Sequence, residues 1–365
     1  MLEVADIFRL HGPQYREQFG ARMLPSHRRA MQDIEQCRTA ALGGQLFFCQ
    51  QCDEKRYSYH SCKNRHCPKC GNDQANEWLA QQQNLLLPVP HFMVTFTLPA
   101  ELRAVARSNQ KAIYNLLFRA SAAALMKLAQ DPRFIGARPG MVGVLHTWTR
   151  QLLYHPHVHY IVTGGGLTSD GRWLSSRPDF LVPVKALSAI FRAKFRDQLQ
   201  KSALFAQVDQ LAWKKKWVVH SEPVGSGIQA FQYLAPYIFR VAISNNRLRS
   251  LHEGQVSFSY KESATDQTKR CTIPAAEFIR RFLQHVLPLR FIKVRYYGLL
   301  SPAQRPLLHK VRQLLPARKS AAQAPAPILP AEQLAIANRQ SAMRSCPSCR
   351  APLTLLGSIP RGRPP

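Results

Sequence analysis

The chain has 365 residues, a length that allows two or three domains and a core of ordinary size. Its 50 lysines and arginines against 21 aspartates and glutamates give a formal net charge of +29, which predicts a polyanionic partner, nucleic acid above all. A hydrophobic content of 45% excludes wholesale disorder, and the absence of an 18-residue apolar run argues against a membrane span or a membrane partner. The N-terminus, MLEVADIFRLHG, does not resemble a signal peptide, so we expect a cytoplasmic protein.

The predicted elements alternate between helices and strands along the first 300 residues. Residues 1–36 are expected to form amphipathic helix, punctuated by Pro13 and Pro25. A β-branched and aromatic run predicts a strand at 91–98, and apolar residues at helical spacing predict one long helix over 102–129. The same criteria predict helices from residue 73 and at 186–201, 229–239 and 274–282, and strands at 141–148, 157–164, 217–224, 256–260 and 291–298. We expect the strands at 141–148 and 157–164 to pair antiparallel, because a short segment joins them.

The last 65 residues differ in composition from the rest of the chain. They hold 11 of the 26 prolines and ten basic residues against a single acid, Glu332. We expect a basic, partly disordered tail that adds salt-sensitive affinity for nucleic acid. The predicted organisation is therefore a helical segment (1–36), a zinc-binding domain (37–90), a mixed domain of about 200 residues (91–300) and the tail (301–365).

Six of the nine cysteines lie between residues 37 and 70. Clustering of this kind predicts metal binding in a reducing compartment rather than a disulfide framework. Two Cys-x-x-Cys pairs, Cys49 with Cys52 and Cys67 with Cys70, are expected to close one tetrahedral structural zinc site. The segment between the pairs is too polar for a core of its own, so zinc would supply its folding energy.

A second zinc ion remains open at this stage, because further ligand types lie in the same region. Its candidates are Cys37, Cys62 and His66, with His60 as a further histidine of the region. In the tail, Cys346-x-x-Cys349 is expected to be half a site, because it has no partner pair nearby in the sequence.

The most informative stretch is Tyr154-His155-Pro156-His157-Val158-His159. On a strand, His157 and His159 project to the same side while Val158 points into the core. His146, on the preceding predicted strand, can approach them if the two strands pair. Three imidazoles would hold a divalent ion with open positions, as in a catalytic site; the alternative is a pair of exposed histidines on an edge strand. Only Glu101, Asp131 and Asp170 are acidic between residues 91 and 170, which argues against a carboxylate-based two-metal nuclease.

Tyr233 and Tyr237 stand four residues apart in a predicted helix. A tyrosine beside a metal-polarised phosphodiester can attack phosphorus and store the ester as a phosphotyrosine, although tyrosines at this spacing are more often core residues. Pro236, between them, removes a hydrogen bond if the segment is helical.

The strand VTFTL, the His-hydrophobic-His strand and the later Tyr-x-x-x-Tyr, in this order, resemble the HUH endonuclease domain of rolling-circle replication proteins. The sequence is most similar to two-tyrosine rolling-circle transposases of bacterial insertion sequences, the insertion sequence ninety-one group. Their N-terminal zinc-binding region resembles CRTAALGGQLFFCQQC and SYHSCKNRHCPKC, and further similarity lies in GVLHTWTRQLLYHPHVHYIVTGGGL and YLAPYIFRVAISNNRL. The resemblance covers residues 20–300.

The resemblance implies an α+β fold, with a five-stranded antiparallel sheet that carries the histidines centrally and a tyrosine helix packed across it. It implies Mg²⁺ or Mn²⁺ on His157, His159 and His146. Tyr233 and Tyr237 would be the nucleophiles, each forming a 5′-phosphotyrosine and freeing a 3′-hydroxyl. The activity implied is nicking and rejoining of single-stranded DNA at insertion-sequence ends, in the bacterial cytoplasm at the nucleoid, with the host replication machinery as a further partner.

Basic residues supply the expected DNA contacts. Lys293 and Arg295 alternate with tyrosines on the last predicted strand, and Lys63 and Arg65 lie in the zinc region, where they would help to recognise the element's end. Two other functions remain open: a plasmid or phage replication initiator with the same chemistry, and a zinc-dependent DNA-binding regulator whose histidines and tyrosines are structural. The oligomeric state is not indicated.

Overall fold

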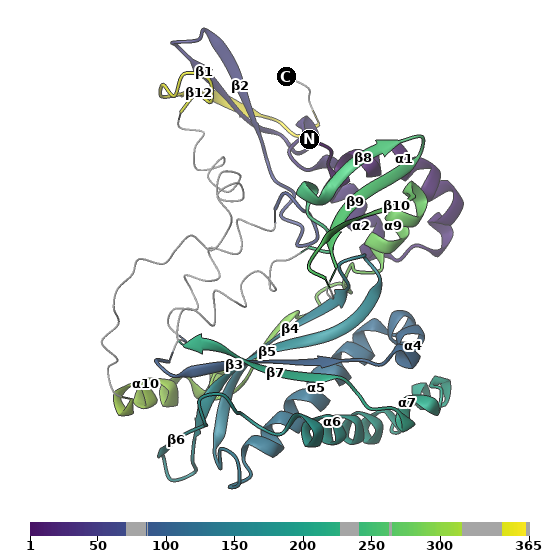
Figure 1. Cartoon of the computed structure of the whole chain (residues 1–365). Coiled ribbons are helices and arrows are strands. Elements are labelled where there is room, and N and C mark those ends of the chain that lie inside the picture. The colour runs from purple at the N-terminus through teal and green to yellow at the C-terminus, as the bar shows by residue number, and fades with distance from the viewer. Residues whose placement is uncertain (71–84, 86, 227–240, 263–264, 316–344, 363–365) are drawn as a thin grey trace.

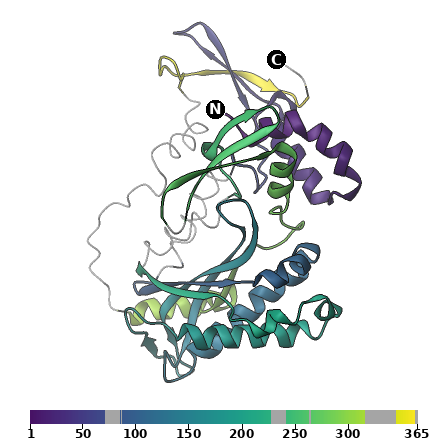
Figure 2. The same ribbon diagram turned by 45° about the vertical axis from the view of Figure 1, so that its right-hand side comes forward.

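The computed structural model describes residues 1–70, 85, 87–226, 241–262, 265–315 and 345–362. It is an α+β structure in which every strand pairing is antiparallel, as predicted. Figures 1 and 2 show two bodies, one built on the largest sheet and one that contains the N-terminal helices. Within the described part of the chain, no helix combines the length and hydropathy that a membrane span requires.

The main sheet has the strand order β11-β4-β5-β3-β7, with β6 paired to one end of β5. Its strands are β3 (Pro90–Thr97), β4 (Arg138–Trp148), β5 (Tyr154–Leu167), β6 (Trp173–Ser175), β7 (Val219–Ser226) and β11 (Val294–Gly298). The predicted pairing of β4 with β5 is confirmed, and β5 is the middle strand of the five.

Helices cover one face of this sheet along its length. They are α4 (Arg103–Ser108), α5 (Gln110–Ala129), α6 (Val184–Leu199) and α7 (Leu211–Lys214). Phe96, Val158 and Tyr160 of the sheet belong to the same buried cluster as Phe118 and Phe191 of the helices. On the opposite face, α10 (Arg305–Leu314) packs over one end of the sheet, with Leu308 and Val311 beside Val142 and Ile161. The rest of that face is the side to which the histidines point.

The helix predicted over 102–129 is broken into α4 and α5 at Asn109. Its backbone has φ −128° and ψ 46°, and both its backbone amide and its side-chain amide donate to the carbonyl of Val105. Asparagine commonly satisfies a helix end in this way, which is why apolar periodicity alone did not reveal the break.

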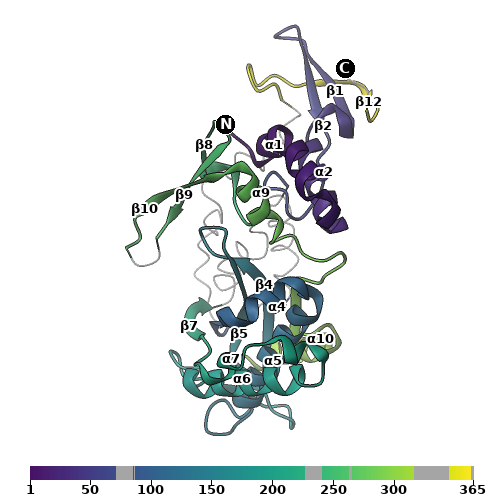
Figure 3. The ribbon, with the colours of Figure 1, turned by 90° about the vertical axis from the view of Figure 1, so that its right-hand side faces the viewer.

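The second body joins the N-terminal helices to a segment from the middle of the chain. It contains α1 (Val4–Phe19), α2 (Pro25–Gln36), β8 (Leu248–His252), β9 (Gln255–Lys261), β10 (Thr268–Pro274) and α9 (Ala275–Leu283). Their apolar side chains form one cluster, in which Phe8 and Phe282 meet edge to face at 5.2 Å. Figure 3 shows α9 lying between the N-terminal helices and the main sheet. Pro13, expected to punctuate the first helix, lies within α1.

A third sheet joins the two ends of the chain in the order β12-β1-β2. Its strands are β1 (Gly44–Cys49), β2 (Glu54–Tyr59) and β12 (Thr354–Ile359). Two segments of the tail, which was expected to be partly disordered, form regular structure, as α10 and as β12. The predicted domain limits stay a prediction, but the packing shows that residues 241–262 and 265–286 share a core with the N-terminal helices.

Candidate active site and metal centres

The three candidate histidines lie on the two adjacent strands β4 and β5. His146 is directly opposite His157 in the register, and His159 is two residues further along β5, so all three project from one face of the sheet. The ring centroids are 5.5 Å apart for His146 and His157, 5.0 Å for His146 and His159, and 4.7 Å for His157 and His159. One ring nitrogen from each lies within 4.8 Å of the others. This spacing suits ligands of a single metal ion.

Hydrogen bonds orient two of these imidazoles. Nδ1 of His157 lies 2.6 Å from the carbonyl oxygen of His155, which can only accept, so Nδ1 carries the proton and Nε2 keeps its lone pair. Nδ1 of His159 lies 2.9 Å from Oγ1 of Thr95, which is its partner on β3. Burial lowers the pKa of His157 to about 4. The neutral, oriented imidazole is the form that binds a metal.

The arrangement fits a divalent ion with open coordination positions, because three imidazole nitrogens leave room for further ligands. His155 accepts a hydrogen bond at Nδ1 from Arg103 at 2.8 Å. On β7, His220 is paired with Thr95 and therefore faces the histidine side, together with Glu222 two residues on. The search for acids between residues 91 and 170 could not find Glu222, because strand order and not sequence distance brings β7 to this sheet.

Tyr233 and Tyr237 lie outside the described residues, and so does Pro236. Their predicted role as nucleophiles stays a prediction.

Cys37, Cys62, Cys67 and Cys70 form the first cysteine cluster, with sulfur atoms within 4.8 Å of one another. Sγ of Cys70 is 3.6 Å from Sγ of Cys37 and 3.7 Å from Sγ of Cys62. A tetrahedron with zinc–sulfur bonds of about 2.3 Å has sulfur–sulfur edges of about 3.8 Å, so the cluster has the dimensions of a zinc site. The ligands draw on two segments that the sequence separates by some 25 residues, the end of α2 and the loop after β2.

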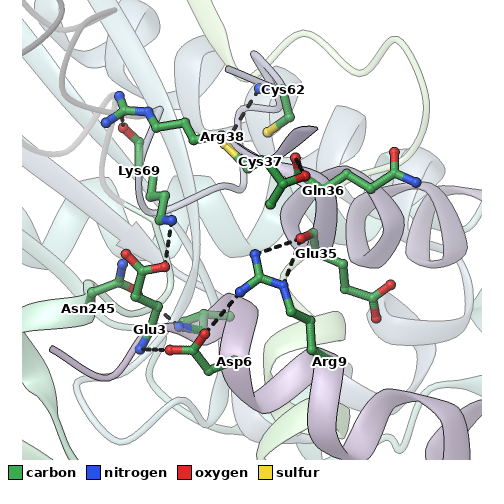
Figure 4. Close-up of polar contacts among 12 residues, drawn as sticks. Glu3, Asp6, Arg9, Glu35, Gln36, Cys37, Arg38, Cys62, Lys69 and Asn245 are labelled. Carbon is green, nitrogen blue, oxygen red and sulfur yellow. Dashed lines mark hydrogen bonds and ion pairs between the residues drawn. The ribbon is translucent and has the colours of Figure 1, made fainter. Parts of the chain in front are cut away.

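Polar contacts lock the first cluster onto the start of α1. The backbone amide of Cys62 donates to Sγ of Cys37 at 3.5 Å, and Arg38 donates to the carbonyl of Lys69 at 3.2 Å. Lys69 in turn forms an ion pair of 2.5 Å with Glu3, as Figure 4 shows. The loop that carries these ligands is thus tied both to the end of α2 and to the N-terminus.

The expected pairing of the two Cys-x-x-Cys motifs is wrong. Cys49 and Cys52 lie not with Cys67 and Cys70 but with Cys346 and Cys349, in a second cluster whose four sulfur atoms lie within 4.8 Å. The physical reason is strand pairing: β12 pairs with β1 and so brings the C-terminal motif to the turn between β1 and β2. The pair at 346–349, expected to be half a site, has its partner some 300 residues earlier.

His66, a candidate zinc ligand, belongs to neither cluster. Its Nε2 accepts a hydrogen bond from the backbone amide of Leu287 at 3.3 Å, and burial holds its pKa well below the usual value. Arg65, expected to contact DNA, donates to the carbonyls of Phe291 (2.7 Å) and Pro288 (3.3 Å). Both residues tie the first cysteine cluster to the segment that leads into β11. A backbone donor lies within reach of His66, and backbone acceptors lie within reach of Arg65.

Two other basic residues expected at the DNA are also engaged inside the molecule. The guanidinium of Arg295 lies 4.3 Å from the ring centroid of Phe118 on the helical face and is hydrogen-bonded to Asn115. Nζ of Lys293 lies 5.4 Å from the ring centroid of Trp148, and burial lowers its pKa to about 7. Lys63 is exposed and keeps its expected role as a prediction.

Fold and site together define an α+β protein with a histidine centre on its main sheet and separate cysteine centres. Two family descriptions match the chain: "Putative transposase" over residues 140–306 and "Transposase zinc-binding domain" over residues 7–98. The protein belongs to this family of transposases, the insertion sequence ninety-one group. It is 43% identical over 324 residues to "Putative transposase y4qJ" of Sinorhizobium fredii, covering 83% of this chain and 81% of the relative.

A second relative is "Transposase for insertion sequence element IS801" of Pseudomonas savastanoi pv. phaseolicola. It is 29% identical over 283 residues, which are 73% of this chain and 68% of the relative. A metal-bound structure of the conjugative relaxase TrwC with oriT DNA shows 21% identity over 31% of this chain and 43% of that chain, with a TM-score of 0.25. The family assignment rests on the sequence relatives and the two domain matches.

Proposed function

We propose that this transposase nicks and rejoins single-stranded DNA at the ends of its insertion sequence through a 5′-phosphotyrosine intermediate. His146, His157 and His159 would hold Mg²⁺ or Mn²⁺, and Tyr233 and Tyr237 would be the nucleophiles. Cys37, Cys62, Cys67 and Cys70 would hold a structural zinc ion. The same proposal places the protein in the bacterial cytoplasm at the nucleoid, where host replication enzymes can extend the freed strand.

The observation that carries the proposal is the orientation of His157. Its Nδ1 proton is used by the carbonyl of His155, so Nε2 keeps its lone pair, and one ring nitrogen of each of the three histidines lies within 4.8 Å of the others. A structural histidine needs no lone pair held free in this way. A divalent ion bound there would neutralise charge on the scissile phosphate.

The chemical step conserves the number of phosphate esters. The phenolic oxygen of a tyrosine forms a bond to phosphorus while the bond from phosphorus to the 3′-oxygen breaks. The tyrosine proton is lost to solvent or a nearby base, and the 3′-oxygen leaves as a hydroxyl after taking up a proton. Attack by a 3′-hydroxyl on the phosphotyrosine reverses these changes and rejoins DNA without another energy source. Two tyrosines would let one of them cut a DNA strand while the other stays joined to a strand that is already cut.

The decisive experiment uses an oligonucleotide that carries the terminal sequence of the element and a label at its 3′ end. With Mn²⁺, we expect a labelled protein band that survives denaturing electrophoresis, because the 5′-phosphate side stays on the enzyme. The double variant Tyr233→Phe and Tyr237→Phe should form no adduct, whereas the matched control Tyr260→Phe, on β9, should form it normally. His157→Ala with His159→Ala should bind the oligonucleotide and fail to form the adduct.

Three outcomes would overturn the proposal. An adduct that persists in the double tyrosine variant would place the nucleophile elsewhere. Tight binding by the native protein with no adduct under either metal would favour a DNA-binding regulator. Cleavage confined to a plasmid or phage origin would favour a replication initiator, which family membership makes the weaker alternative.

A further inference from the structure

We propose that the protein contains a second zinc site, split between its two ends, in which Cys49, Cys52, Cys346 and Cys349 bind one Zn²⁺ and fasten the C-terminal segment to the zinc-binding region. This site does not depend on the DNA chemistry proposed above. The matched zinc-binding domain covers residues 7–98 and so includes only half of the ligands.

The sulfur positions have the dimensions of a zinc tetrahedron. Sγ of Cys49 is 3.5 Å from Sγ of Cys349, and Sγ of Cys52 is 3.8 Å from Sγ of Cys346. These values bracket the distances in the first cluster and lie near the edge of about 3.8 Å expected for four sulfurs around zinc. They are far from the disulfide bond length of about 2.05 Å. Four thiolates with no nitrogen or oxygen ligand select zinc over magnesium or calcium.

The backbone around each cysteine pair is folded in the same way. In both Cys-x-x-Cys motifs the residue after the second cysteine, Asp53 or Arg350, has a left-handed φ, of 53° and 63°. Among the described residues, eight non-glycine residues have such a φ, and four of them directly follow a cysteine of the two clusters. This conformation is unfavourable for a residue with a Cβ. Its recurrence after cysteines of both clusters indicates that the same local backbone turn presents the sulfur atoms in each.

The third sheet has nothing else that could serve as a core. Among the described residues, no side chain of β1, β2 or β12 belongs to any of the three buried apolar clusters, whereas Cys49 and Cys346 are 0% and 1% exposed. Most of β12 is exposed, including Leu355 and Leu356. A three-stranded sheet that adds no side chain to an apolar cluster needs a bound metal in place of a core.

The first test is the zinc content of the purified full-length chain, measured by mass spectrometry of the metal. We expect two zinc ions per chain in the native protein and one in the double variant Cys346→Ser with Cys349→Ser. Cys271→Ser is the matched control, because Cys271 lies on β10 outside both clusters, and it should retain two. One zinc in the native protein, or two in the double variant, would overturn the site. Two disulfides found after alkylation without reductant would overturn it as well.

The second test measures how firmly the tail is attached, from its rate of cleavage by trypsin. It uses only the native protein and so does not depend on the folding of a variant. Trypsin can cleave after Arg350, which directly follows the Cys346-x-x-Cys349 motif, and after Arg361, beyond β12. In the native protein, stripping zinc with a mercurial reagent should accelerate cleavage after Arg350 at least tenfold and leave cleavage after Arg361 nearly unchanged. Equal rates at Arg350 with and without metal would contradict the proposal.

Discussion

The two cysteine clusters both consist of four cysteines with nearly the same sulfur spacing, but they differ in the apolar packing around them. In the first, Cys37, Cys67 and Cys70 belong to the apolar cluster that includes Phe8, Phe282 and the N-terminal helices. The second lies in a sheet with no side chain in any of the buried clusters of the described residues. The first is part of a folded body, whereas the second fastens an added strand to it. Loss of one cysteine ligand should therefore affect the stability of the protein differently at the two sites, although both would bind zinc through four cysteines.

The largest difference is expected between Cys67→Ser and Cys349→Ser. Loss of the buried Cys67 removes a metal ligand and puts a hydroxyl into the core beneath α1 and α9, so the free energy of unfolding should fall by more than about 4 kcal/mol. Cys349→Ser should leave the unfolding midpoint unchanged and open only the tail. Denaturant unfolding followed by circular dichroism measures the first effect, and hydrogen exchange of residues 345–362 measures the second.

If both substitutions lowered the midpoint equally, the second site would belong to the same cooperative unit as the first. In that case it would be wrong to distinguish the first site, which lies in an apolar core, from the second, which does not.

The core beneath the first cluster should also be sensitive to pH through His285. This histidine is buried, with Nε2 3.1 Å from the carbonyl oxygen of Leu152 and Nδ1 3.2 Å from Oγ1 of Thr147, and burial lowers its pKa to about 4. Because its pKa in the unfolded chain is about 6.5, the unfolded state binds more protons between these values. Stability from His285 is therefore present above pH 6.5 and is lost as the pH falls toward 4.

The comparison of native protein with His285→Gln isolates this contribution, since any loss of zinc at low pH affects both proteins. The difference in unfolding free energy between them should shrink by about 2 kcal/mol from pH 7 to pH 5. A constant difference across this range would show that the imidazole is not held neutral by the fold.

The sequence signals that succeeded are local ones. Alternation along residues 157–159 placed two histidines on one face, and the short connection to 141–148 predicted the hairpin that adds His146. Each Cys-x-x-Cys motif was recognised as a pair of metal ligands from a spacing of three residues. Such signals suffice when the partner groups lie on one strand, one turn or one hairpin.

What failed was the choice of partners across long distances. The Cys49 and Cys52 pair was assigned to the nearer motif, because nothing in residues 345–362 shows that β12 pairs with β1. The basic residues show a related limit. Arg65 and Arg295 were predicted to contact DNA, and the fold gives them internal partners that the sequence does not indicate: the carbonyls of 288 and 291, and the ring of Phe118. Charge predicts a class of partner but not whether a given side chain is already used inside the protein.

A smaller effect should separate Arg65, which donates hydrogen bonds to two backbone carbonyls, from its neighbour Lys63. Arg65→Ala removes the hydrogen bonds to the carbonyls of Phe291 and Pro288, so we expect the free energy of unfolding to fall by about 1 to 3 kcal/mol. Lys63→Ala should change stability by less than about 0.5 kcal/mol. In salt titrations of oligonucleotide binding, Lys63→Ala should reduce the salt dependence, and Arg65→Ala should not.

The reverse result, with Arg65 essential for binding and neutral for stability, would mean that these hydrogen bonds open when DNA binds. The first cluster would then be less firmly joined to the main sheet than its contacts indicate.

The smallest effect tests whether the tail is held by its thiols or by ordinary surface contacts. Arg56 donates a hydrogen bond of 2.8 Å to Oγ of Ser348, at the exposed rim of the second cluster. Exposed polar contacts contribute little, so Ser348→Ala should keep two zinc ions and should speed trypsin cleavage after Arg350 by less than about threefold. The β1–β12 ladder stays intact in this variant, as do all four sulfurs. If Ser348→Ala freed the tail as completely as the loss of Cys346 and Cys349, side-chain contacts and not a metal would fasten it.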